Sequence, residues 1–218
     1  MKSEVISKKR VADYGEVLTG KREVNAMLDL VKEQTERIDS RFLEPACGNG
    51  NFLTVILERK LAVVEKRYRK SQLEFERNAF LAVSSLYGID ILSDNVSQCR
   101  ERLYDVFDRD YYTRLFKKRA KEKCRDAVRF VLGRNIVWGD ALTLKTVGAN
   151  PDHIVFSEWS PVKRSMIKRR DFTFHELVSR KSREGASLVS DLGEDVFIPV
   201  PVNEYPLVHF MELAHAQQ

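Results

Sequence analysis

The chain has 218 residues, a length that favours one domain with one sizeable core over two domains. Its 43% hydrophobic and 32% charged residues exclude a disordered protein and favour a globular domain with a heavily charged surface. No apolar run approaches the roughly 20 residues of a membrane span, and the start of the chain lacks the apolar middle of a secretion signal, so we expect a cytoplasmic protein.

The charge and the metal-binding residue types give weaker signals. A net charge of +5 would suit a polyanionic partner, although surplus Lys and Arg is common on solvated surfaces. The cysteines are odd in number and lack paired spacing, so we expect reduced thiols at Cys47, Cys99 and Cys124. The histidines show no ligand spacing, so no metal is expected at His153, His175, His209 or His215.

The first half of the chain alternates helices with short strands. Helical spacing of apolar residues over 23–38 predicts an amphipathic helix, and a buried strand over 41–44 runs into a glycine-rich turn before a helix that resumes at Asn51. Residues 61–86 predict a further helix with a break near Lys70 and Ser71. A second strand over 85–91 follows, and Ser93 or Asp94 can cap the next helix.

The second half continues the alternation and then loses it. The basic segment 114–129 is helical in pattern, and short strands are expected over 135–140 and 153–156. Beyond them we expect a helix over 172–178, a polar loop over 180–186 and a proline-containing edge strand or extended segment over 196–202. The alternation predicts an α/β fold with a mostly parallel sheet and helices on both faces.

The glycine turn carries a resemblance to a known family. In an open parallel sheet, ligands bind outside the carboxyl ends of the strands, where glycine lets the backbone approach the ligand closely. Residues 44–53 read Glu-Pro-Ala-Cys-Gly-Asn-Gly-Asn-Phe-Leu. This segment resembles the first motif of the adenine-specific DNA methyltransferases, an acid followed by Pro-Ala-Cys-Gly-Ser-Gly and an apolar pair. The resemblance implies a Rossmann-like class I methyltransferase fold with S-adenosylmethionine as cofactor.

Further motifs of that family appear in the same order along residues 10–162. Residues 12–20 look like the upstream motif that closes over the methionine end of the cofactor, except that Gly20 replaces proline. Residues 88–91 are similar to the second motif, and residues 139–142 are similar to the third, whose acid faces the adenine end. The resemblance places cofactor contacts at Tyr14, Gly15, Thr19, Glu44, Pro45, Ala46, Cys47, Gly48, Gly50, Asn51, Phe52, Asp90, Ile91, Gly139, Asp140 and Ala141.

Each acid of these motifs also has a plainer interpretation. A carboxylate at the end of the second strand can accept from both ribose hydroxyls, which makes Asp90 the candidate. Asp90 follows Glu44 by 46 residues (90 − 44), more than the spacing of about 20 in dinucleotide-binding units, but restriction-type methyltransferases commonly insert a helix there. Taken singly, Glu44 could cap the following helix, and Asp90 or Asp140 could belong to a turn.

The expected catalytic motif is not intact. Adenine's amino group is a poor nucleophile, so an enzyme must accept its hydrogen bonds, align the methyl donor and take the base out of the stack. The family uses Asn, Asp or Ser, then Pro-Pro and an aromatic residue after the fourth strand. Here Glu158, Ser160 and Pro161 are candidate acceptors and Trp159 a candidate stacking platform. A second interpretation makes Trp159 a core residue and Glu158 a surface charge. In a third, catalysis is lost while cofactor binding remains.

A cluster of basic residues follows the candidate catalytic segment. Two interpretations of this cluster are open: it could hold DNA phosphates, or it could belong to a solvated loop. Its residues are Lys163, Arg164, Lys168, Arg169 and Arg170.

We predict one domain, with a cofactor-closing segment over 1–40, a cofactor-binding core over 41–162 and an extension over 163–218.

The predicted function is transfer of a methyl group from S-adenosylmethionine to adenine in DNA, of the restriction–modification type. DNA and a separate specificity or nuclease subunit are the expected partners, with no membrane and no metal. The alternatives are a non-catalytic or partner-dependent subunit that binds cofactor or DNA, and a methyltransferase that acts on RNA or protein.

Overall fold

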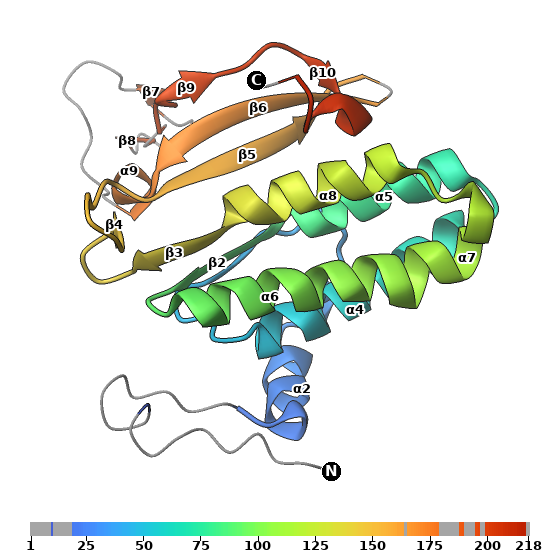
Figure 1. Cartoon of the computed structure of the whole chain (residues 1–218), viewed down its shortest axis with the longest axis horizontal. Helices are drawn as coiled ribbons and strands as arrows, with labels where there is room; N and C mark the ends of the chain where they lie inside the picture. The colour runs from blue at the N-terminus through green and yellow to red at the C-terminus, as the bar shows by residue number, and fades with distance from the viewer. Residues whose placement is uncertain are drawn as a thin grey trace.

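The computed structural model describes residue 10, residues 19–163, 165–178 and 199–216, and the backbone of 188–189 and 195–196. The predictions for Tyr14, Gly15, Arg164 and the loop 180–186 lie outside these residues. Helices pack against a small sheet, and a long hairpin crosses over two of the helices (Figure 1). None of the helices in the described ranges combines the length and the apolar character that crossing a bilayer requires.

The first sheet has the strand order β1-β2-β3-β4. Its strands are β1 (Phe42–Glu44), β2 (Leu86–Asp90), β3 (Ile136–Asp140) and β4 (Lys145–Thr146). β1 pairs with β2 and β2 with β3 in parallel, whereas β4 pairs with β3 antiparallel. The predicted α/β class and its first three strands are therefore confirmed, and the sheet is mixed.

The helices follow the predicted order with different breaks. α4 (Asn51–Tyr68) and α5 (Gln72–Ser84) are separated at the predicted point, and the Ser71 hydroxyl accepts from the Glu74 N–H to cap α5. The helix predicted over 23–38 is instead α2 (Lys21–Asp29) and α3 (Lys32–Thr35). The helix predicted over 114–129 is likewise divided into α7 (Arg114–Phe116), the 3-10 helix η2 (Lys117–Arg119) and α8 (Glu122–Asn135).

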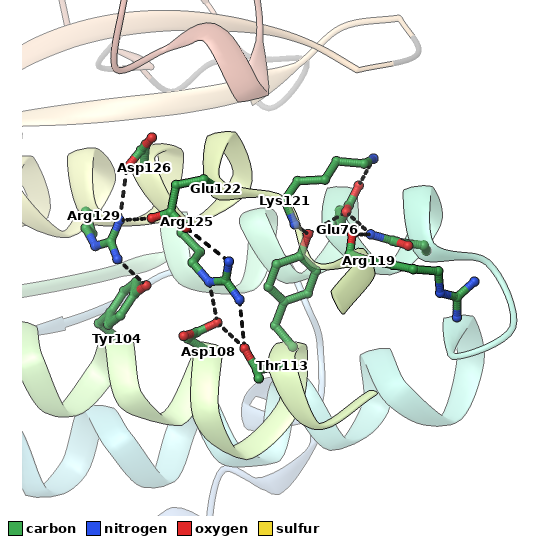
Figure 2. A network of polar contacts seen from close by, with 12 residues as sticks. Glu76, Tyr104, Asp108, Thr113, Arg119, Lys121, Glu122, Arg125, Asp126 and Arg129 are labelled. Carbon is green, nitrogen blue, oxygen red and sulfur yellow. Dashed lines mark hydrogen bonds and ion pairs between the residues drawn. The ribbon is translucent and has the colours of Figure 1, made fainter. Parts of the chain in front are cut away.

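A polar network joins α8 to the long helical segment formed by α6 (Ser93–Asp105) and the π-helix η1 (Val106–Thr113), into which α6 continues. Arg125 of α8 donates to Asp108 and to Thr113 of η1, and Arg129 donates to the Tyr104 hydroxyl (Figure 2). Beside them, the buried carboxylate of Glu76 accepts from the Tyr112 hydroxyl. These contacts fix α8 against α6 and η1.

The two faces of the first sheet are covered differently. Leu86 belongs to the main core with α4, α5, α6 and α8, whereas Ile89 belongs to a second cluster with Ile154, Phe156 and Phe174. Phe174 begins the short helix α9 (Phe174–Val178). Helices α4 to α8 therefore cover one face, and the second face carries the start of the hairpin and α9. Leu43 on β1 remains half-exposed.

The predicted fourth strand belongs to a second sheet. β5 (Val155–Pro161) pairs antiparallel with β6 (Met166–Thr173), and β6 also pairs with β9 (Asn203–Glu204) and β10 (Val208–His209). The 3-10 helix η3 (Phe210–Glu212) follows, and β7 (Leu188–Val189) pairs with β8 (Asp195–Val196). Of the segment predicted as extended over 196–202, Val196 lies in β8 and residues 199–202 lie outside any strand.

Candidate functional site

The carboxyl ends of β1, β2 and β3 form one edge of the first sheet, which we call the rim. The glycine turn between β1 and α4 lies there, with Gly48 at φ 52° and Gly50 at φ 88°. A Cβ on Gly50 would stand 2.7 Å from the Cys99 sulfur, so both backbone conformation and space require glycine at this position. The glycine turn predicted from the sequence therefore packs against Cys99 of α6, as well as joining β1 to α4.

Asp90 fastens the glycine turn to the end of β2. Its Oδ2 accepts from the Gly48 N–H at 2.8 Å, and its Oδ1 accepts from the Leu92 N–H at 2.8 Å and from the Asn95 amide at 3.2 Å. A carboxylate offers about four lone-pair sites, so three protein donors leave capacity for about one more. Asp90 is thus a buried structural residue of the rim whose carboxylate keeps a lone-pair site for about one further donor.

An apolar surface lies on the rim between Asp90 and Asp140. Register pairs Asp90 with Trp138, so Asp140 stands two residues further along the neighbouring strand. Ile91 is 45% exposed and Trp138 39% exposed, and the indole N–H of Trp138 donates to the Ile91 carbonyl at 2.9 Å. The Leu142 N–H donates to the Asp140 carboxylate and lowers its pKa, which keeps this partly exposed acid ionised. Trp138 was not among the residues predicted from the sequence, although its position two residues before Asp140 could have indicated it.

Glu44 at the end of β1 is partly buried, and Cys47 in the glycine turn is buried. Burial raises the pKa of Glu44, and the Ala46 N–H opposes this shift. The Cys47 thiol has its pKa raised by its hydrogen bond with Cys99 and by burial, which keeps it protonated. Cys47, Cys99 and Cys124 are all buried and free. Cys47 therefore serves packing and hydrogen bonding.

Two residues near the start of the chain, Arg10 and Thr19, contact the helices that begin at the rim. The Thr19 carbonyl accepts from the Asn51 amide at 3.1 Å, and Arg10 forms an ion pair with Asp94 at 2.6 Å. Arg102 of α6 donates to the Asn49 carbonyl at 2.7 Å and to the Asn51 side chain at 2.8 Å. Sequence reasoning missed Arg10 and Arg102, because they contact the site from distant positions without a motif of their own.

The candidate catalytic segment leads away from the rim. Ile154 packs against Gly139 at the carboxyl end of β3, whereas Glu158 forms an ion pair with Arg41, next to the amino end of β1. β5 therefore runs from the rim toward the opposite edge of the sheet. Pro161 lines a cavity with Tyr68, the last residue of α4. An 18-residue helix is about 27 Å long, and the glycine turn lies at its other end.

This geometry contradicts the prediction that Glu158, Trp159, Ser160 and Pro161 lie beside the cofactor. Trp159 is buried between Phe80 and Phe130 in edge-to-face contacts, and its indole N–H donates to Asn135 at 3.1 Å. Glu158 is held by Arg41 and Arg170. The alternative in which Trp159 is a core residue agrees with the structure, and Glu158 is a paired charge.

The basic residues after Pro161 are mostly engaged within the protein. Arg169 is 1% exposed, pairs with Asp171 at 2.6 Å and lies 4.1 Å from the Tyr205 ring centre. The prediction that Arg169 contacts DNA phosphates is therefore wrong, because strand alternation places it on the inner face of the hairpin. Lys168 pairs with Glu204 and Arg170 with Glu158, while Lys163 is exposed at the hairpin turn.

The described residues contain no group of three or more His, Cys, Asp and Glu that could hold a metal ion. Comparison of the chain with protein-family models, with curated proteins and with solved structures finds no match.

Proposed function

We propose that this chain binds S-adenosylmethionine at the rim and has the Rossmann-like fold of the class I methyltransferases, as a cofactor-binding domain of the adenine-specific DNA methyltransferase type. The observation that carries the proposal is the hydrogen bond from the Gly48 N–H to Asp90. It joins the glycine turn after β1 to the acid that ends β2, which are the two elements that a nucleoside ligand requires at adjacent parallel strands.

The residues of the rim fit such a ligand. Ile91 and Trp138 offer exposed apolar surface for a purine ring, and the Asp140 carboxylate beside them can accept from an amino group. Asp90 has capacity for about one further donor, so it would accept from one ribose hydroxyl instead of two. When bound, the cofactor supplies a methyl group on a sulfonium, which is the electrophile for a nitrogen acceptor.

A partner-dependent methyltransferase subunit is favoured over a self-sufficient enzyme. The segment expected to hold the target amine lies toward the opposite edge of the sheet, and Trp159 is in the core. A second chain that holds the base next to the rim would restore the arrangement that methyl transfer requires. DNA remains the proposed substrate, in the cytoplasmic location expected from the sequence.

Isothermal titration calorimetry with S-adenosylmethionine tests the binding proposal. We expect saturable one-to-one binding that S-adenosylhomocysteine competes away and that ATP and NAD do not. If neither S-adenosylmethionine nor S-adenosylhomocysteine releases or absorbs heat on the folded protein, and neither raises its melting temperature, the proposal is wrong.

A further inference from the structure

One end of the molecule carries a cluster of exposed cations that the rim does not use. The residues 65–77 and 114–121 contain ten Lys and Arg and three acids. Each acid is paired: Glu65 with Arg114, Glu74 with Arg77, and Glu76 with Lys121. The remaining seven cations are exposed and form no ion pair with the described residues, and we call them the basic end: Lys66, Arg67, Arg69, Lys70, Lys117, Lys118 and Arg119.

Two contacts between distant segments bring these cations to one surface. The Arg114 guanidinium binds Glu65 near the end of α4 at 2.6 Å, and the Gln72 amide at the start of α5 donates to the Arg119 carbonyl at 2.7 Å. The end of α4, the start of α5 and the η2 turn therefore lie side by side. Figure 2 shows the Arg119 side chain pointing away from the Glu76 network, toward solvent.

The cations of the basic end are suited to a polyanion whose phosphates are spread over a surface. A membrane-bound surface usually adds apolar anchors to its cations, and of the exposed large apolar side chains described, only Leu73 belongs to these segments. Guanidinium and ammonium groups that lack acid partners are suited to phosphate oxygens, and their binding releases the counterions of a nucleic acid.

We propose that the basic end binds the phosphate backbone of duplex nucleic acid without reading its sequence. It lies at the opposite end of α4 from the glycine turn, so it goes beyond the proposed cofactor site. The hairpin turn that carries Lys163 is nearby, because its neighbours Pro161 and Ser165 line a cavity with Tyr68 and Glu74. Lys163 can therefore add one phosphate contact at the margin of this surface.

The test measures fluorescence anisotropy of a labelled 20-base-pair duplex of arbitrary sequence, titrated with the full chain at several salt concentrations. Two separate triple variants remove charge from the basic end: K117Q/K118Q/R119Q and K66Q/R69Q/K70Q. The matched control, K21Q/R22Q/K145Q, removes three exposed cations that lie elsewhere, in α2 and β4 (Figure 1). Circular dichroism and thermal melting verify that all three variants fold as the parent does.

We expect each basic-end variant to bind the duplex at least about tenfold more weakly than the control at roughly 0.1 M salt. Because each phosphate contact contributes about 0.9 to the slope of log affinity against log salt, that slope should fall by roughly two to three. Equal affinity of both basic-end variants and the control overturns the proposal, and so does binding to phosphatidylserine vesicles without binding to the duplex. These readouts need no cofactor, so they separate this proposal from the failure of S-adenosylmethionine binding.

Discussion

At the scale of single residues, Asp90 has a structural role and a proposed binding role, and the sequence alone does not distinguish the two. It accepts from Gly48, Leu92 and Asn95 in the free protein, and it is the proposed acceptor for the cofactor ribose. Its position could be predicted, because a strand that ends in an acid before a helix is a local pattern. Its hydrogen bond from the Gly48 N–H could not be predicted, because Gly48 lies 42 positions away in the chain.

Asp90→Ala should weaken S-adenosylmethionine binding by about 1–3 kcal/mol, through the lost ribose acceptor and a less firmly held glycine turn. Calorimetry at one temperature measures the change. Glu101→Ala is the control, since it removes an exposed carboxylate of the following helix α6 that no contact among the described residues joins to the rim. Wild-type affinity in Asp90→Ala would remove this acid from the cofactor site.

Trp159→Ala should destabilise the protein by about 3–5 kcal/mol, because it empties the space between Phe80 and Phe130 and leaves the Asn135 carbonyl oxygen without its donor. Urea unfolding measures the loss. In the fraction that remains folded, S-adenosylmethionine affinity should be unchanged. A variant with the stability of the wild type would contradict the place of Trp159 in the core.

At the scale of elements, Lys60 joins α4 to the segments that lead into β1 and β2. Its fully buried ammonium donates to the Ile38 carbonyl at 3.0 Å, to the Ser40 carbonyl at 2.5 Å and to the Ser85 hydroxyl at 2.9 Å. Desolvation lowers the pKa of Lys60 to about 7. Helical periodicity places position 60 on α4, but its charge gives no sign that it is buried, since most lysines lie on the surface.

The pKa of Lys60 predicts how stability depends on pH. Between about 7 and 10.5 the unfolded chain holds a proton that the folded chain has released, so the free energy of unfolding should rise with pH across this window. The rise is at most about 1.4 kcal/mol per pH unit. It should appear in urea titrations at several pH values as a growing difference between wild type and Lys60→Met, which lacks this titration. Parallel pH profiles would contradict it.

At the scale of the whole molecule, the direction of β5 separates the proposed cofactor site from the predicted catalytic segment. β5 begins near Gly139 at the rim and reaches Arg41 beside the amino end of β1, so it runs against the direction of the three parallel strands. It pairs with β6 instead of the first sheet. The rim therefore has a proposed place for the methyl donor and no described segment that holds the acceptor.

The chain alone should bind S-adenosylmethionine and transfer no methyl group to unmethylated DNA. Transfer of a tritiated methyl group measures this, with an active adenine methyltransferase as the positive control for the substrate. Activity that appears on adding a partner subunit would support the proposed role, whereas adenine methylation by the chain alone would show that the acceptor residues do reach the rim.

The sequence by itself determined the elements whose causes are local. The glycine turn, the break capped by Ser71, the first three strands of the first sheet and the α/β class all follow from patterns a few residues long. The tertiary structure decided what depends on distant partners: the reversed direction of β5, the burial of Trp159 and Arg169, and the contacts of α4 with α7 and of α5 with η2 at the basic end. A local pattern records how a segment folds, but which face it buries and against what depends on contacts between residues far apart in the chain.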